Sequence, residues 1–323
     1  MSVTLASPRI ASQIFSLLEK AILETLAYSD VFDYPLTLDE LYRYLVISAT
    51  KEEIKNCVAN MNQVDFKDGY YFLFINQLNH VALSDNEGSL PQLSETLRLP
   101  KSGSLRVTNL VETRKSRELK SRKAFDRAML YGKILGRFPF VRMVALTGSL
   151  AMLNLSTDMD MDYMLVTQPN RLWIARAFAV TFGRIMRLLG DRICINLLIS
   201  ENALHWKDHD LYSAREICQM IPISGFDTYR NFRVANLWTE EFLPNATMAS
   251  IALPIDMERL AYPLHMLESL AMKIQLKIIS KRTNPNDETN FTADICQGNF
   301  HQHKKWTQIE YEKRLKEYVI ASE

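Results

Sequence analysis

Residues 141–167 constrain the fold more than any other part of the chain. A run of apolar residues ends in Gly148-Ser149, and after a further turn region Asp160-x-Asp162 opens a second apolar run. Because side chains alternate across a β-strand, Asp160 and Asp162 are expected to point to the same face. A buried strand, a glycine turn, a short helix and a second strand with paired carboxylates predict a sheet at the core of a mixed α/β domain.

Each part of this segment suits the binding of a phosphate or of a metal ion. Gly148 lets a backbone approach a phosphate without a side chain in the way. Ser149 adds a hydroxyl, and the amides at the start of the following helix add further donors. The Asp160 and Asp162 carboxylates can hold Mg²⁺, which prefers oxygen ligands and keeps several waters. The plain alternative is an aspartate-rich surface turn between two strands.

The segment resembles the nucleotidyltransferase superfamily of the DNA polymerase beta type. The spacing from Gly148 to Asp160 and Asp162 is similar to that of small bacterial and kanamycin-type nucleotidyltransferases, and Asp158 takes the acidic position often found just before the Asp-x-Asp pair. Flanking residues also look like a group of uncharacterised bacterial proteins that join a winged helix to this domain. The resemblance implies an α+β fold, catalytic Asp160 and Asp162 with bound Mg²⁺ or Mn²⁺, and NTP phosphates held at Gly148 and Ser149.

One feature departs from the superfamily pattern, which usually has a third carboxylate on a later strand. The best-placed strand here is residues 192–197, whose inward polar residue is Asn196. An amide can lend its oxygen to a metal, so Asn196 is a candidate third metal ligand, but it cannot act as a general base. Asp191 could substitute, although its register is wrong by one residue. The chain therefore either uses two carboxylates and a substrate group or binds nucleotide without turnover.

Two arginines are further candidates for nucleotide binding. Arg171 and Arg176 lie on the helix expected at residues 171–189, near where a triphosphate would extend. Guanidinium groups suit bidentate contact with phosphate. A solvated helix face is the alternative interpretation of both residues.

Residues 1–76 carry the pattern of a winged helix-turn-helix. Thr37 and Thr50 each begin a helical segment and are each followed three residues later by a glutamate, which is the spacing of a capping box. Asp68-Gly69 then joins two short strand-like runs, a strong hairpin signal. The candidate recognition helix mixes lysines with glutamates, so docking of either nucleic acid or protein stays open.

The remaining chain divides by composition and periodicity. Residues 77–110 are rich in Ser, Asn, Gly and Pro and predict a linker or excursion loop. Residues 111–222 are expected to form the nucleotidyltransferase core. Residues 223–323 are expected to form a helical C-terminal region, because an apolar stripe at helical spacing follows residue 257.

Composition excludes little beyond a membrane protein. The 38 basic and 37 acidic residues balance, so a nucleic-acid partner cannot be argued from net charge. The clearly uncharged run at residues 242–255 is short and holds two prolines, which does not suit a membrane span. With no signal-peptide pattern at the N-terminus, we expect a cytoplasmic protein without a membrane partner.

The expected function is a Mg²⁺-dependent transfer of a nucleoside monophosphate from an NTP, for which ATP is the first candidate, to an unidentified acceptor. The alternative is a catalytically degenerate regulatory protein, in which the core senses nucleotide and the winged helix docks DNA or protein. Acceptor specificity lies outside the shared motif, so the sequence leaves the acceptor open.

Overall fold

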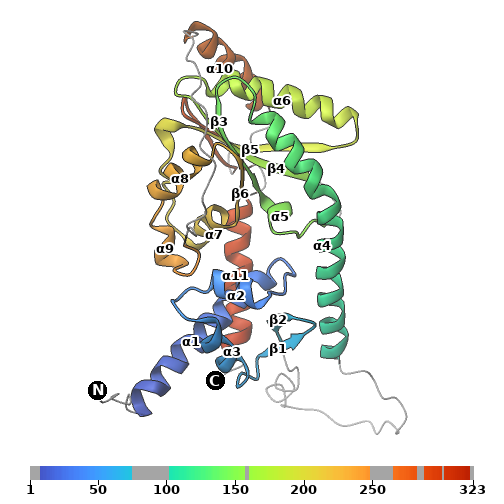
Figure 1. Ribbon diagram of the computed structural model, residues 1–323, viewed down its shortest axis with the longest axis vertical. Coiled ribbons are helices and arrows are strands. Elements are labelled where there is room, and N and C mark those ends of the chain that lie inside the picture. The colour runs from blue at the N-terminus through green and yellow to red at the C-terminus, as the bar shows by residue number, and fades with distance from the viewer. Residues whose placement is uncertain are drawn as a thin grey trace, which may run out of the picture. The chain divides into compact units, whose positions relative to one another are not determined.

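The computed structural model describes residues 8–74, 102–156, 160–247, 265–281, 287–299 and 302–320 (Figure 1). The chain forms two compact units. The first comprises residues 1–116, 243–245 and 307–323, and the second comprises residues 117–242 and 246–306. The expected α+β class is confirmed, because the second unit contains a mixed six-stranded sheet flanked by helices.

The first unit contains three helices and a two-stranded sheet near its N-terminus. These are α1 (Pro8–Asp30), α2 (Leu38–Tyr44), α3 (Lys51–Val58), β1 (Val64–Lys67) and β2 (Tyr70–Leu73). Complete capping boxes are present at Thr37 and Thr50, as their sequences predict. The turn between β1 and β2 has positive φ at both Asp68 (53°) and Gly69 (90°), which gives the tight antiparallel hairpin expected there.

The second unit is built on a sheet with strand order β6-β3-β4-β5-β8-β7. Its strands are β3 (Val141–Thr147), β4 (Asp160–Thr167), β5 (Arg192–Ser200), β6 (Ile221–Ser224), β7 (Glu288–Phe291) and β8 (Ile295–Asn299). In the described sheet β4 and β5 run parallel, and the other neighbouring pairs are antiparallel. Because β4 and β5 are parallel, their first residues, Asp160 and Arg192, are paired at the same edge of the sheet.

Helices pack on both faces of this sheet (Figure 1). The helices that follow α3 are α4 (Ser102–Leu135), α5 (Gly148–Ala151), α6 (Leu172–Leu188), α7 (Leu211–Gln219), α8 (Phe226–Ala235), α9 (Thr239–Phe242), α10 (His265–Ile279) and α11 (His303–Ile320), with a 3-10 turn at Glu201–Ala203. On one face, buried residues of β3, β4 and β5 pack against α4 and α6. The hydroxyl of buried Tyr163 donates to the Ala128 carbonyl of α4 at 2.7 Å, which fixes this face of β4 against the helix. The opposite face of β4 carries the polar site.

Two regional predictions need correction. Helix α4 begins at Ser102, so the predicted loop 77–110 ends earlier than expected, and its residues 77–101 lie outside the described residues. The region 223–323 is not only helical, because β7 and β8 form a hairpin whose second strand pairs with β5. These strands are short and lack a regular apolar alternation, so they are stabilised by pairing with a distant strand and not by a local pattern.

No helix in the described part of the chain is both long enough and apolar enough to span a membrane.

Candidate functional site

The two aspartates of β4 lie on the same face of the sheet. Burial alternates along the strand, since Met161 and Tyr163 are fully buried in the core while Asp160 and Asp162 are only partly buried. This is the placement that strand periodicity requires. Two carboxylates therefore meet at the edge where β4 begins, beside the first residues of β5.

Asn196 faces the aspartates, as expected. Its amide nitrogen donates to Asp162 Oδ1 at 2.7 Å. A β-bulge in β5 contributes to this geometry: Tyr163 pairs with Ile195, but the next residue of β4 pairs with Leu197, so Asn196 is the extra residue. The amide nitrogen, not its oxygen, points to Asp162, and the oxygen lies 2.7 Å from the Cys194 thiol sulfur, which donates to it.

Asp191 does not substitute for the missing third carboxylate. The residue is buried, and its carboxylate accepts a 2.6 Å hydrogen bond from the Tyr131 hydroxyl. Its other oxygen lies 2.8 Å from the Arg127 guanidinium. Both partners belong to α4, which covers the face of the sheet opposite Asp162. The one-residue register difference noted in the sequence thus places Asp191 in a structural ion pair with α4.

Desolvation and like charge shape the electrostatics of the aspartate pair. Burial raises the pKa of Asp162 to about 6, and the Asp160 carboxylate adds to the rise, whereas the hydrogen bonds from Asn196 and Cys194 oppose it. Asp160 Oδ1 lies 2.8 Å from Arg192 Nε, although the two groups are not aligned as a hydrogen bond. Arg192 therefore supplies partial charge compensation at Asp160, while Asp162 retains an unusually high proton affinity.

Gly148 brings the backbone against Asp162. It has a φ of +64°, and a Cβ added to it would lie 2.5 Å from Asp162 Oδ2. A side chain at this position would meet both a left-handed backbone and the carboxylate. Ser149, the next residue, is exposed at the start of the one-turn helix α5. The structure thus brings Gly148, Ser149, Asp160, Asp162 and Asn196 to one edge of the sheet.

The structure does not bring Arg171 and Arg176 to the edge of the sheet that carries Asp160 and Asp162. Both residues follow the far end of β4. That end of the strand lies about 16 Å from Asp162, because a strand rises about 3.3 Å per residue. Arg171 is buried, donates to the Asn170 carbonyl and lies over the Phe140 ring. Arg176 donates to Gln275 of α10 at 2.7 Å. Because α6 runs back along β4, its beginning lies where the strand ends, so these two arginines lie away from the aspartates and their role in nucleotide binding stays a prediction.

The N-terminus of α6 is also occupied by a protein carboxylate. Glu268 of α10 accepts hydrogen bonds from the backbone nitrogens of Trp173 (2.6 Å) and Ile174 (3.0 Å). These are the free donors that would otherwise bind an anion at the start of a helix. Glu268 thus acts as a structural cap, and these two donors of the helix end are already engaged.

Sequence reasoning missed three residues near the aspartates. Arg192 and Cys194 share a face with Asn196 by strand alternation, so the strand pattern could have identified both. Although Cys194 is exposed overall, desolvation of its thiol and the negative charges of Asp162 and Asp160 raise its pKa to about 12. The thiol therefore stays protonated and can donate to Asn196.

Glu216 is the third residue and had no sequence signal. It lies on α7, directly before β6, whose first residue pairs with Leu146 at the end of β3. Burial raises the pKa of Glu216 to about 7, the Asp162 charge raises it further, and a hydrogen bond from Gln219 opposes the rise. A carboxylate from a helix distant in sequence thus has its pKa raised in part by the negative charge of Asp162.

The donor set suits a hard cation. Asp160 and Asp162 offer carboxylate oxygens on one face, and Mg²⁺ commonly uses one or two carboxylates together with water and substrate phosphates. Within the described ranges, no group of three His, Cys, Asp or Glu side chains could hold a metal ion by itself. For Asn196 to become a ligand, its amide would have to turn so that the oxygen and not the nitrogen faces the pair.

Comparison with known proteins assigns no family. No protein-family model matches the chain, no curated protein matches it, and no solved structure matches its fold.

Proposed function

We propose that the protein is a Mg²⁺- or Mn²⁺-dependent nucleotidyltransferase of the DNA polymerase beta type. It would transfer a nucleoside monophosphate from an NTP, with ATP as the first candidate, to a hydroxyl acceptor. The observation that carries the proposal is the contact of three elements at one sheet edge: the aspartate pair of β4, the side-chain-free Gly148 against Asp162, and Asn196 on Asp162. This is the arrangement that the spacing of the sequence motif anticipates.

Each residue at this edge has a defined task in the proposal. Asp160 and Asp162 bind the divalent ion, which would offset the negative charge of the α-phosphate and of the departing pyrophosphate. Gly148 lets the Asp162 carboxylate lie directly against the backbone of the turn, and the turn with its exposed Ser149 hydroxyl binds the β- and γ-phosphates. Asn196 holds the Asp162 carboxylate in place through its 2.7 Å hydrogen bond.

Calorimetry with ATP and Mn²⁺ tests the proposal. The wild-type protein should bind ATP only when the divalent ion is present, and Asp160→Ala should abolish that binding without unfolding the protein. Asp126→Ala, which removes an exposed aspartate of α4, is the matched control and should bind like the wild type. Unchanged ATP affinity in Asp160→Ala would remove the metal site from consideration. If the wild type binds ATP as expected, labelled NTPs incubated with protein and cell extract would reveal the acceptor.

A second candidate function is nucleotide sensing without efficient turnover. Asn196 favours it, because an amide stands at the strand position next to Asp162 and cannot take a proton from the acceptor. General-base catalysis typically contributes about 10²–10⁴ in rate. Single-turnover pyrophosphate release by Asn196→Asp distinguishes the two candidates. A rise in rate indicates a weakened enzyme, whereas no release from either protein, with ATP binding intact, indicates a sensor.

We also propose that the N-terminal helices and hairpin form a winged helix used for docking. Three helices, two capping boxes and the Asp68-Gly69 turn support this. The lysines of α3 are engaged, since Lys51 lies 2.6 Å from Asp39 and Lys55 lies 4.0 Å from Glu52. Such pairing favours a protein partner over DNA, whose binding relies on available cations. Binding to a random-sequence duplex at low salt would contradict this preference.

A further inference from the structure

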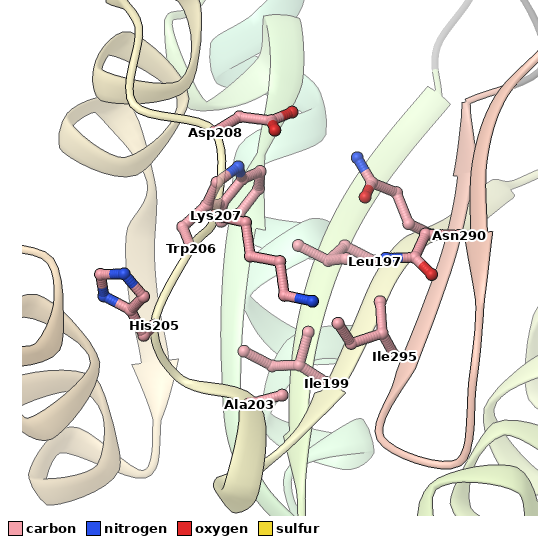
Figure 2. Close-up of a pocket in the computed structure, with 10 residues that line it drawn as sticks. Leu197, Ile199, Ala203, His205, Trp206, Lys207, Asp208, Asn290 and Ile295 are labelled. Atoms are coloured by element: carbon pink, nitrogen blue, oxygen red, sulfur yellow. The ribbon is translucent and has the colours of Figure 1, made fainter.

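A pocket lies between β5, the β7–β8 hairpin and the loop that follows β5 (Figure 2). It has a volume of about 120 Å³. Its floor includes Leu197 and Ile199 of β5, which pair with Met164 and Val166 of β4. These two positions of β4 alternate in step with Asp160 and Asp162, so the pocket and the carboxylates share one face.

The pocket combines an apolar floor with a polar rim. Ile295 of β8 completes the floor, and the half-buried indole of Trp206 forms a wall. Amide groups of Asn290 and Gln297 line the side formed by the β7–β8 hairpin. Small-molecule sites typically have such a floor with a few polar groups that orient the ligand.

Lys207 gives the pocket its charge preference. Figure 2 shows its side chain extended into the pocket from the loop that follows β5. Asp208 also lines the pocket, but its carboxylate lies 2.8 Å from the Lys304 amine, which also contacts Asp210 at 2.7 Å. Within the part of the chain that the structure describes, Lys207 forms no ion pair or hydrogen bond. An anionic group on a ligand would therefore meet this amine.

The sheet order places the pocket and the phosphate-binding turn on opposite sides of β4. Gly148 and Ser149 follow β3, which neighbours β4 on one side, and the pocket lies over β5 and β8 on the other. In nucleotidyl transfer the attacking and leaving oxygens stand in line on opposite sides of the α-phosphorus. If pyrophosphate departs toward Gly148, the acceptor oxygen enters from the side of β5.

We propose that this pocket holds the acceptor, a small hydroxyl compound with an apolar or aromatic body and an anionic group that binds Lys207. This inference rests on the proposed nucleotidyltransferase function. The acceptor oxygen bonds to the α-phosphorus, the bond from that phosphorus to the bridging oxygen of pyrophosphate breaks, and the hydroxyl proton passes to solvent. Leu197 pairs with Met164, two residues beyond Asp162, so the near end of the pocket lies about 7 Å along the sheet from Asp162.

Binding of 8-anilinonaphthalene-1-sulfonate tests the pocket, because this fluorescent probe joins an aromatic body to an anion. Lys207→Met should weaken probe binding about fivefold, the effect of losing one partly solvated ion pair. The matched control is Lys277→Met, which removes an exposed lysine beside the exposed apolar Ile274 and Ile278 of α10, where the probe could also bind. This control should leave the affinity unchanged.

The same titration with saturating ATP and Mn²⁺ separates the acceptor from the nucleotide. Simultaneous binding of probe and ATP, with Lys207→Met altering only the probe, supports the acceptor pocket. Competitive displacement of the probe by ATP overturns the acceptor role and indicates that the pocket binds the nucleobase. Equal affinities in wild type and Lys207→Met overturn the pocket alone. Failure of the wild type to bind ATP, with the Lys207 effect intact, removes the proposed function and with it the acceptor role.

Discussion

At the scale of single residues, the site depends on close contact between a backbone position and a carboxylate. Gly148 and Asp162 come closest, since a Cβ on Gly148 would collide with Asp162 Oδ2. Asp162 in turn is partly desolvated and lies beside a second carboxylate. Functional sites often keep such unfavourable local features because ligand binding relieves them.

Gly148→Ala should abolish ATP binding in Mn²⁺, because the methyl group would displace the Asp162 carboxylate. Gly190→Ala is the matched control: Gly190 also has positive φ, at +90°, but a Cβ added to it would meet no other group of the described chain within 4 Å. Both variants should lose about 1 kcal/mol for the left-handed backbone, measured by urea unfolding. Only Gly148→Ala should lose nucleotide affinity in calorimetry; equal loss in both would mean that strain and not contact is responsible.

Asp162→Asn should stabilise the metal-free protein at alkaline pH. Folding raises the pKa of Asp162 from 3.8 to about 6, so the folded state binds a proton more tightly and loses stability as pH rises through that window. The asparagine variant escapes this loss. In EDTA, its free energy of unfolding should exceed that of wild type by about 3 kcal/mol at pH 8, the worth of a shift of about two pKa units, and the difference should become small near pH 4. A pH-independent difference would contradict the assigned pKa shift.

At the scale of secondary-structure elements, contacts between distant segments decide what each element can do. The N-terminus of α6 illustrates this, because its free backbone donors are taken by Glu268 of α10. The bulge in β5 is a second case, since the pairing with β4 shifts by one residue after Asn196 and brings Leu197 opposite Met164. Neither the cap nor the bulge has a local sequence pattern, so the sequence alone leaves a phosphate-binding role for α6 open.

Glu268→Ala should destabilise the sheet-containing unit by about 2 kcal/mol, because two backbone donors of α6 would remain buried without an acceptor. Glu268→Gln should lose less, since its amide oxygen can still accept one of the two bonds. Glu240→Ala, which removes an exposed glutamate in the first turn of α9, is the control and should change stability little. Thermal unfolding measures all three. ATP affinity should persist in Glu268→Gln, and its loss would restore a phosphate role to this helix end.

At the scale of the whole molecule, the first unit is discontinuous in sequence. It joins the N-terminal residues to the end of α11, where Arg314 Nε lies 2.7 Å from Asp30 Oδ2 of α1. Asp30 is buried. The expected boundary at residue 76 therefore omits a C-terminal segment that contributes to the same unit.

Arg314→Ala should destabilise this unit by about 3 kcal/mol, because a buried carboxylate loses its charged partner. Hydrogen exchange should show faster exchange of α1 amides, with β4 amides as the internal reference. Lys316→Ala, an exposed neighbour on α11, should leave α1 protection unchanged. Similar effects of both variants would mean that the ion pair adds nothing beyond the helix itself.

The sequence by itself determined the features whose causes are local. Capping boxes at Thr37 and Thr50, the Asp68-Gly69 hairpin and the shared face of Asp160 and Asp162 each follow from backbone geometry over a few residues. Asn196 could be anticipated in the same way, because strand alternation fixes which side chains face inward. The α+β class was implied by the resemblance, and the strand and helix signals predicted a mixed sheet with flanking helices.

Only the tertiary structure decided the features that depend on partners far along the chain. Arg171 and Arg176 lie away from the aspartates because α6 reverses direction after β4, and Asp191 is held by Tyr131 and Arg127 of α4. Glu216 comes near Asp162 through a helix, and Lys207 lines the pocket through a loop, and no motif marks either segment. The physical reason is that the spacing of apolar and polar residues indicates which face of an element a residue occupies. The residues that it contacts across that face are determined by long-range packing.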